Sequence, residues 1–271
     1  MTASQSLPPL SVRPREGAWW RVQREVIHRF VLGPARATPP GPLLKTDLFD
    51  EASGPHHPLA ARPAGFLPVA IDVDAGVARR ARARLAGQGI VAPLVVADVR
   101  RLPFAAGAFA LVVSLSTLDH LASEDEIARA LAETFRVLRP GGRLLLTLDN
   151  PLNPEVALRR VLPRAIVARL RADIFPLGVT LGPRRGRRVL ERAGFIVEDQ
   201  TYLVHALRYP AIRILALLER RGRAAWAEHL VGRLEALARW PTGPLTGHFV
   251  AWVARKPDLP ASRAPKRAEH R

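Results

Sequence analysis

Three carboxylates stand in a series along the first hundred residues, each at the end of an expected strand. Asp47, Asp72 and Asp98 follow one another at intervals of about 26 residues. In an open parallel sheet, ligands bind at the carboxyl ends of the strands, close to the point where the strand order reverses. A carboxylate at the end of the second strand can accept hydrogen bonds from both hydroxyls of a ribose. The series therefore suits one ligand lying across several strand ends, with Asp72 as the candidate for the ribose.

The elements that would position these carboxylates are short apolar runs, which alternate with helical patterns from residue 43 onward. This alternation is typical of βαβ units in a parallel sheet. Asp74 is an expected helix N-cap, and Ser123 with Glu126 forms a capping box before the next helix. We therefore expect an α/β fold. The expected strands are 43–48, 67–71, 92–97, 109–115, 143–148, 195–204 and 247–254.

The rest of the chain is interpreted as additions to one domain. Residues 15–31 have the spacing of an amphipathic helix, whose Trp19 and Trp20 either pack on the domain or contact a membrane or partner. The expected divisions are an N-terminal tail with this helix at 1–40, the domain at 41–255 with helical insertions at about 151–192 and 203–246, and a disordered tail at 256–271.

Composition excludes several classes of protein. The chain has 271 residues, of which 48% are hydrophobic and 24% are charged, as in a globular protein rather than a disordered or coiled-coil chain. It contains no cysteine, which excludes disulfide frameworks, thiolate metal sites and cysteine nucleophiles. Residues 1–10 are polar and do not resemble a secretory signal, so we expect a cytoplasmic protein.

The net charge of +17 leaves two interpretations open. Arg supplies all but three of the 41 basic residues, and such Arg richness also results from a GC-rich genome. Alternatively, the basic residues face an acidic partner, such as nucleic acid or an anionic membrane. Ten Arg fall within 151–192, so this segment is the candidate for such a surface.

Four phrases along the chain carry a family resemblance. They are Val-Ala-Ile-Asp-Val-Asp at 69–74, Val-Ala-Asp-Val-Arg-Arg-Leu-Pro-Phe at 96–104, Phe-Ala-Leu-Val-Val-Ser at 109–114 and Val-Leu-Arg-Pro-Gly-Gly-Arg-Leu-Leu-Leu at 137–146. In this order and spacing, the chain resembles class I S-adenosylmethionine-dependent methyltransferases, and most of all their small-molecule branch. The resemblance covers about residues 41–150. It implies a Rossmann-like, seven-stranded, mostly parallel sheet with helices on both faces and helical insertions near the C-terminal half.

The resemblance also implies roles for individual residues. The cofactor would be S-adenosyl-L-methionine, and Asp72 would bind its ribose hydroxyls. Val73 would touch the adenine face, and Asp98 would accept a hydrogen bond from the adenine amino group. The backbone amide of Val99 would bind the adenine ring.

The end of the fourth expected strand is where the resemblance places the reaction. Ser114 and Leu115 would lie where the cofactor and the methyl acceptor meet. Methyl transfer is an in-line displacement that requires no metal, and a base is needed only when the acceptor must lose a proton. His120 follows this strand and is the candidate general base, although a capping or packing role explains it equally well.

One segment departs from the family pattern. Where the family carries a glycine-rich loop after the first strand, residues 44–54 read Leu-Lys-Thr-Asp-Leu-Phe-Asp-Glu-Ala-Ser-Gly. Glycines at such a loop let the backbone approach a ligand. Either Asp47 and Glu51 hold the ammonium group of the cofactor, or the pocket no longer binds it. Lys45 would pair with one of these acids or with the cofactor carboxylate.

Rival functions lack their motifs. No Gly-x-Gly-x-x-Gly, P-loop or Gly-x-Ser-x-Gly phrase is present, which argues against nicotinamide dehydrogenases, P-loop nucleotidases and serine hydrolases. We expect a methyltransferase for a small, rather apolar acceptor, with peripheral membrane contact through the apolar and Arg-rich insertions as an option. The alternatives are a noncatalytic binding protein and, less favoured because aromatic residues do not interleave with the Arg runs, an RNA methyltransferase. The sequence carries no signal of oligomeric state.

Overall fold

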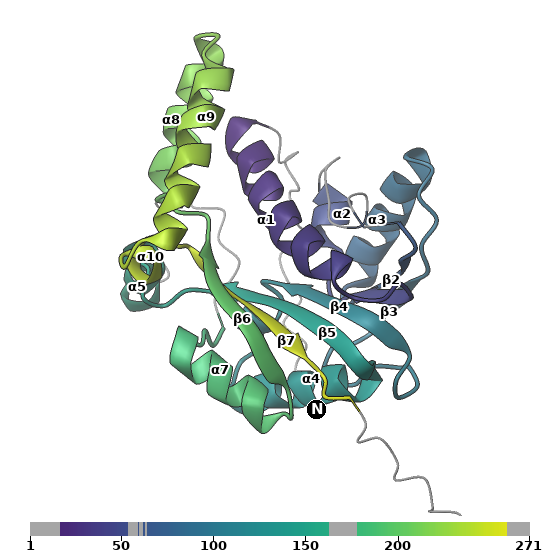
Figure 1. Cartoon of the computed structure of the whole chain (residues 1–271). Helices are drawn as coiled ribbons and strands as arrows, with labels where there is room; N and C mark the ends of the chain where they lie inside the picture. Colours follow the sequence, from purple (N-terminus) through teal and green to yellow (C-terminus); the bar gives the residue numbers. More distant parts are fainter. Residues whose placement is uncertain (1–16, 54–58, 60–61, 63, 163–177, 259–271) are drawn as a thin grey trace, which may run out of the picture.

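One twisted sheet organises the molecule, which we describe from a computed structural model over residues 17–53, 59, 62, 64–162 and 178–258 (Figure 1). Its strand order is β3-β2-β1-β4-β5-β7-β6. β1 to β5 are parallel, whereas β7 runs antiparallel to both of its neighbours. The expected α/β fold with a mostly parallel sheet is confirmed. The strands are β1 Pro42–Lys45, β2 Leu67–Asp72, β3 Leu94–Val96, β4 Phe109–Leu115, β5 Leu138–Asp149, β6 Ile196–Leu203 and β7 Phe249–Arg255.

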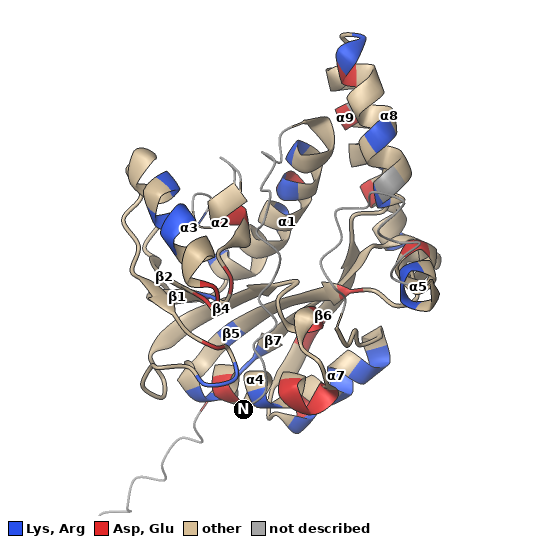
Figure 2. Ribbon diagram, turned by 180° about the vertical axis from the view of Figure 1, so that it is seen from behind, with Lys and Arg blue, Asp and Glu red and all other residues tan. Residues whose placement is uncertain are grey.

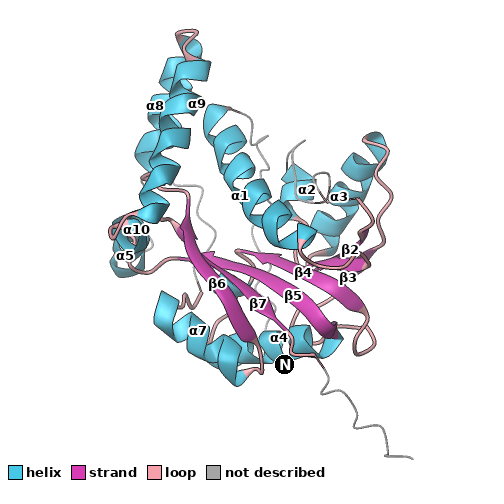
Figure 3. Ribbon diagram, viewed as in Figure 1, coloured by secondary structure: helices cyan, strands magenta, loops and turns pink. Residues whose placement is uncertain are grey.

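Helices cover both faces of the sheet. α1, α2 and α3 lie over one face, and α4 and α7 lie over the other (Figure 3). Each layer buries its own apolar cluster against the strands. The helices in the described residues are α1 Ala18–Arg36, α2 Phe49–Ser53, α3 Ala75–Gly87, α4 Glu124–Val137, α5 Pro154–Val161, α7 Pro183–Arg192, α8 Arg208–Arg220, α9 Ala224–Leu234 and α10 Gly243–Thr246, with 3-10 turns η1 Leu118–His120 and η2 Glu235–Arg239.

The two helices that follow β2 and β4 begin at the caps expected from the sequence. The Asp74 carboxylate accepts hydrogen bonds from the amides of Gly76 and Val77 and starts α3. The Ser123 hydroxyl accepts from the Glu126 amide at 3.2 Å and starts α4. Because an N-cap of this kind contributes about 1 kcal/mol, each strand is followed by a well-defined turn into its helix. These turns lie beside the candidate site.

Helix α1 packs on the domain. Trp19 is only 3% exposed and belongs to the core cluster on this face. Trp20 is half-buried, and the Arg208 guanidinium lies 5.3 Å from its ring centroid. The packing interpretation of these two tryptophans is therefore confirmed, and the pair does not form an exposed apolar contact surface.

The strand order reverses at β1, which is the feature that positions the site. β2 lies on one side of β1 and β4 on the other, with Lys45 in register with Ala70 and Val113. The connections that leave β1 and β4 therefore diverge, and in open α/β sheets ligands bind at the carboxyl ends of the strands at such a switch point. The expected placement of a ligand at this edge rests on that topology.

The insertions and tails are described only in part. Segment 151–192 contains α5 and α7, and the residues between 163 and 177 lie outside the described part of the chain. Segment 203–246 contains α8, α9, η2 and α10. Most of the expected tail at 256–271 lies outside the described residues. Lys256 itself is held in place, since its ammonium donates to the carbonyls of Phe135 and Leu138.

Candidate active site at the carboxyl edge of the sheet

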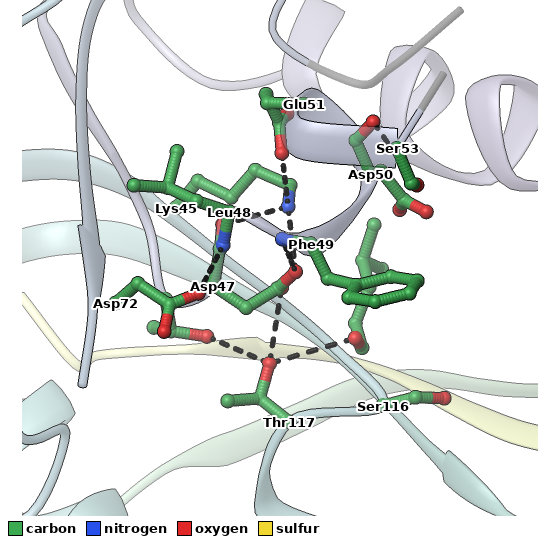
Figure 4. A network of polar contacts seen from close by, with 12 residues as sticks. Lys45, Asp47, Leu48, Phe49, Asp50, Glu51, Ser53, Asp72, Ser116 and Thr117 are labelled. Atoms are coloured by element: carbon green, nitrogen blue, oxygen red, sulfur yellow. Dashed lines mark hydrogen bonds and ion pairs between the residues drawn. The ribbon is translucent and has the colours of Figure 1, made fainter. Parts of the chain in front are cut away.

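The loop after β1 is built around a buried lysine. The Lys45 ammonium donates to the Asp47 carbonyl at 2.8 Å, to the Asp47 carboxylate at 3.0 Å and to the Glu51 carboxylate at 2.9 Å (Figure 4). Lys45 and Glu51 are fully buried. Burial acts to lower the pKa of Lys45, but the nearby carboxylates outweigh it and raise the pKa above its ordinary value. Lys45 therefore stays charged and holds the loop in one conformation.

This ion pair lies where the sequence resemblance predicts a glycine-rich loop. α2 begins at Phe49, and the Asp47 carboxylate accepts from the Phe49 amide at 3.3 Å. The ammonium that lies against Asp47 and Glu51 is thus that of Lys45, which is one of the pairings expected from the sequence. Binding of the cofactor ammonium by these acids, or of its carboxylate by Lys45, stays a prediction.

Asp72 ends β2 and points towards the same loop. Its carboxylate accepts from the Leu48 amide at 3.0 Å and from the Asp74 amide at 2.8 Å. Burial raises the pKa of Asp72, although these two hydrogen bonds act against the shift. A carboxylate offers about four acceptor positions, so room remains for the two hydroxyls of a ribose. Val73 beside it is 68% exposed, which leaves an apolar surface open for an adenine ring.

Asp98 follows β3 and is paired with a neighbouring arginine. The Arg100 side chain donates to both Asp98 oxygens, at 3.0 Å from Nε and 2.6 Å from Nη2, and also to Glu126. This hydrogen bonding lowers the pKa of Asp98. The Asp98 carboxylate is therefore ionised and well oriented. The role of Asp98 in binding the adenine amino group stays a prediction. So does the role of the Val99 backbone amide; the side chain of Val99 is buried in the core.

The end of β4 connects the loop after β1 to the rest of the edge. Ser114 and Leu115 are buried within the strand. Ser116 has a φ of 48°, a conformation that costs a non-glycine residue energy, and its amide donates to Thr147. This turn brings the Thr117 hydroxyl 3.1 Å from the Asp47 carboxylate (Figure 4). Sequence reasoning overlooked Ser116 and Thr117, although the run of hydroxyl residues after the strand was the available signal.

The candidate base His120 is exposed at the end of η1. Its neighbour Asp119 is the buried member of this turn, and one Asp119 oxygen accepts from the Asp149 amide at 2.9 Å. The turn therefore directs the carboxylate inward and the imidazole outward. The role of His120 as a base stays a prediction.

A second polar cluster lies where β4 and β5 end and β7 begins. The Asp149 carboxylate lies 3.7 Å from both the His248 Nε2 and an Arg159 nitrogen. Burial raises the pKa of Asp119 and of Asp149 and lowers the pKa of His248 to about 4. His248 is therefore neutral at pH 7. We call Asp119, Asp149, Arg159 and His248 the inner cluster.

The inner cluster contains polar atoms that the described chain does not satisfy. Among the described residues, no hydrogen-bond partner is found for Asp119 Oδ1, for Arg159 Nε or for either ring nitrogen of His248. Buried polar groups are normally paired, so such atoms at a sheet edge indicate a place for a ligand or for water. Sequence reasoning missed this cluster, because its members lie far apart in the chain.

Asp47 relates the two parts of the site electrostatically. Burial is the largest cause of the raised pKa of Asp72 and of Asp119. The negative charge of Asp47, which lies between them, raises both pKa values further. The carboxylates from β2 to β5 thus form one connected row. Within the part of the chain that the structure describes, no group of three or more His, Asp or Glu side chains is arranged to hold a metal ion.

Known proteins are similar to part of this chain in sequence and to most of it in fold. Residues 53–146 match the family model of the Methyltransferase domain. The ubiquinone/menaquinone biosynthesis C-methyltransferase UbiE of Bordetella parapertussis is 40% identical over 87 residues, which are 31% of this chain and 33% of UbiE. The chain thus spans about a third of the length of the curated relatives it matches.

Solved structures extend the similarity of fold to most of the chain. The [4+2]-cyclase SpnF superposes with a TM-score of 0.61 and 19% identity, covering 91% of this chain and 85% of SpnF. Geranyl diphosphate C-methyltransferase from Streptomyces coelicolor, in complex with Mg²⁺, geranyl diphosphate and S-adenosyl-L-homocysteine, has a TM-score of 0.53 and 17% identity, covering 88% and 79%. At such identities the likeness concerns the fold.

The fold is a Rossmann-like α/β sheet whose strand order reverses at β1. Residues 53–146 are similar in sequence to the Methyltransferase domain family, and the fold of the chain is similar to those of solved methyltransferases. No helix among the described residues combines the length and hydropathy that crossing a bilayer requires.

Proposed function

We propose that the protein is an S-adenosylmethionine-dependent methyltransferase that acts on a small, rather apolar molecule. The observation that carries this proposal is Asp72, a partly buried carboxylate at the end of β2 with acceptor positions remaining, beside the open apolar surface of Val73. The family match over residues 53–146 supports it. So do the names of similar proteins, which refer to quinone biosynthesis and to geranyl diphosphate.

The residues present fit the cofactor at its nucleoside end. Asp72 would hold the ribose hydroxyls, Val73 would lie against the adenine, and Asp98 with the Val99 amide would bind the ring edge. The cofactor, when bound, supplies a methyl group on a sulfonium. The chain contributes alignment of the acceptor and exclusion of water, which are the main sources of acceleration for such a displacement.

The inner cluster is our candidate for the acceptor end of the site. It lies one strand further along the sheet than the cofactor loop, and Asp47 and Thr117 connect the two. Neutral His248 can donate from one ring nitrogen and accept at the other, so it can orient a hydroxyl or carbonyl of the acceptor. The Arg159 side chain beside it favours an oxygen that carries negative charge.

The second candidate function is a noncatalytic or differently catalytic relative. Two observations favour it. Lys45 forms ion pairs with Asp47 and Glu51 of the loop after β1, and Arg100 forms an ion pair with the Asp98 carboxylate. The similarity to a protein named a [4+2]-cyclase also illustrates that one fold serves more than one activity. On this interpretation the protein binds neither S-adenosylmethionine nor S-adenosylhomocysteine.

Isothermal titration calorimetry with S-adenosylhomocysteine separates the two. We expect binding by the wild type, and Asp72→Ala should weaken it by about 1 to 3 kcal/mol, the scale of a lost charge-assisted hydrogen bond. Asp199→Ala, at an exposed position of β6, is the matched control and should bind normally. Undetectable binding by the folded wild type would support the second function. Equal affinity of wild type and Asp72→Ala would refute the role of Asp72.

A further inference from the structure

The helical hairpin formed by α8, α9 and η2 projects from the end of the sheet beside α1 (Figure 1). Its outer surface exposes large apolar side chains, with Trp226 58% and Trp240 63% exposed. Trp226 and Leu230 are four residues apart, so they share one face of α9. The apolar stripe is our name for these exposed side chains, which are Trp226, Leu230 and Trp240 together with Ile214 and Leu217 on α8.

The inner surface of the same hairpin is fully engaged. Leu215 of α8 and Val231 of α9 are buried in the cluster that includes α1. Arg21 of α1 donates to both Glu219 and Glu228 and fastens the hairpin to the domain. The packing of the fold thus explains the inner face of these helices and leaves the apolar stripe unexplained.

Charge is segregated across the hairpin. Residues 207–240 contain seven Arg and three Glu. Glu219 and Glu228 bind Arg21, and Glu235 accepts from the amides of Val204 and His205, so every carboxylate is turned to the domain. In the described chain, no carboxylate pairs with the six outward arginines, which are Arg213, Arg220, Arg221, Arg223, Arg233 and Arg239. Figure 2 shows blue segments along α8 and α9 and at the tip of the hairpin, together with the red segments of the glutamates.

A surface that combines exposed Trp and Leu with unpaired Arg suits an anionic lipid bilayer. Tryptophan favours the boundary between headgroups and acyl chains, and arginine attracts anionic headgroups. A second copy of the chain would bring the same positive charge to the contact and be repelled. A nucleic acid would leave Ile214, Leu217 and Leu230 without partners. We propose that the apolar stripe docks the protein on the surface of an anionic membrane.

This proposal stands independently of the methyl-transfer chemistry. The hairpin connects β6 to β7 and is followed by α10 before the chain reaches His248 of the inner cluster.

Vesicle co-sedimentation of the full chain tests the proposal. The probes are vesicles of phosphatidylcholine with about 30% phosphatidylglycerol and vesicles of phosphatidylcholine alone. We expect binding to the anionic vesicles that weakens with salt, and a blue shift of tryptophan emission. The double variant Trp226→Ala with Trp240→Ala should bind at least about tenfold more weakly. Leu67→Ala, an equally exposed apolar position at the start of β2, is the matched control.

Several outcomes would contradict membrane docking by the apolar stripe. Equal binding to both kinds of vesicle, no binding to the anionic vesicles, or unchanged binding by the double variant would overturn the proposal. Self-association that the double variant abolishes would identify a second copy as the occupant. Binding of single-stranded RNA that depends on Arg223, Arg233 and Arg239, but not on the tryptophans, would identify a nucleic acid. Circular dichroism and the melting temperature verify that the variants are folded.

Discussion

The two halves of the carboxyl edge satisfy their buried polar groups in opposite ways. At the ends of β1 and β2, the Lys45 ammonium has three oxygen partners within 3.0 Å, and both Asp72 oxygens accept backbone hydrogen bonds. In the inner cluster, Asp119, Arg159 and His248 each retain a buried atom without a partner among the described residues. The Lys45 ammonium and the Asp72 carboxylate of the first half are thus paired within the folded chain. The second retains hydrogen-bonding capacity that a ligand can use.

The largest effect should follow from breaking the buried Lys45–Glu51 ion pair of the first half. Lys45→Met would leave Glu51 buried without its cation, and removal of one partner from a buried ion pair costs about 3 to 5 kcal/mol. We expect the free energy of unfolding to fall by that amount in urea titrations. The double variant Lys45→Met with Glu51→Leu should recover most of the loss, because an apolar pair also fills such a site. A single variant as stable as the wild type would show that the ion pair does not hold the loop.

The next effect concerns the inner cluster and the dependence of its stability on acid pH. The pKa of His248 is lowered from 6.5 to about 4 by burial, so the unfolded chain binds a proton between these pH values and the folded chain does not. This linkage should lower the free energy of unfolding by about 3 kcal/mol as the pH falls from 6.5 to 4. Asp149 acts against this lowering of the His248 pKa, whereas Arg208 and Arg159 add to it.

The variant His248→Asn isolates this contribution. Its unfolding free energy, measured in urea at steps across this range, should decline less steeply than that of the wild type. His229→Asn, at an exposed position of α9, should retain the wild-type slope. Identical slopes for wild type and His248→Asn would mean that the imidazole is accessible to protons in the folded state.

The smallest effect concerns the connection between the halves. Thr117→Val removes the hydroxyl that donates to Asp47 at 3.1 Å and should cost about 1 kcal/mol of stability, the scale of one hydrogen bond. Affinity for S-adenosylhomocysteine should fall in parallel, because Asp47 loses an orienting partner. Thr117→Ser, which keeps the hydroxyl, is the control. Should valine and serine behave alike, the hydroxyl has no part in positioning the loop.

Local signals predicted the fold well. The caps at Asp74 and Ser123 and the apolar runs of β2 and β4 depend on neighbouring residues, so they are visible in the sequence. The position of Asp72 at the end of β2 could be predicted equally well, because the end of a strand is a local feature of the sequence. In the first loop the sequence left the partner of Lys45 open. Only the early start of α2 at Phe49 brings Glu51 to the ammonium.

The inner cluster was beyond sequence reasoning for a physical reason. Asp149 and His248 meet because β5 and β7 pair antiparallel, with Asp149 opposite Phe249. No local pattern encodes a register between strands so far apart in the chain. The turn after β4 shows the same limit at short range, since whether Asp119 or His120 faces inward depends on the path of η1.

The positive φ of Ser116 has a mechanical consequence. It reverses the chain immediately after β4, so that one short turn contacts the first loop through Thr117 and continues into Asp119 two residues later. A displacement of the first loop on ligand entry would pull on this turn and be transmitted to the carboxylate beside Asp149. One short turn thus fixes the spacing between the first loop and the inner cluster.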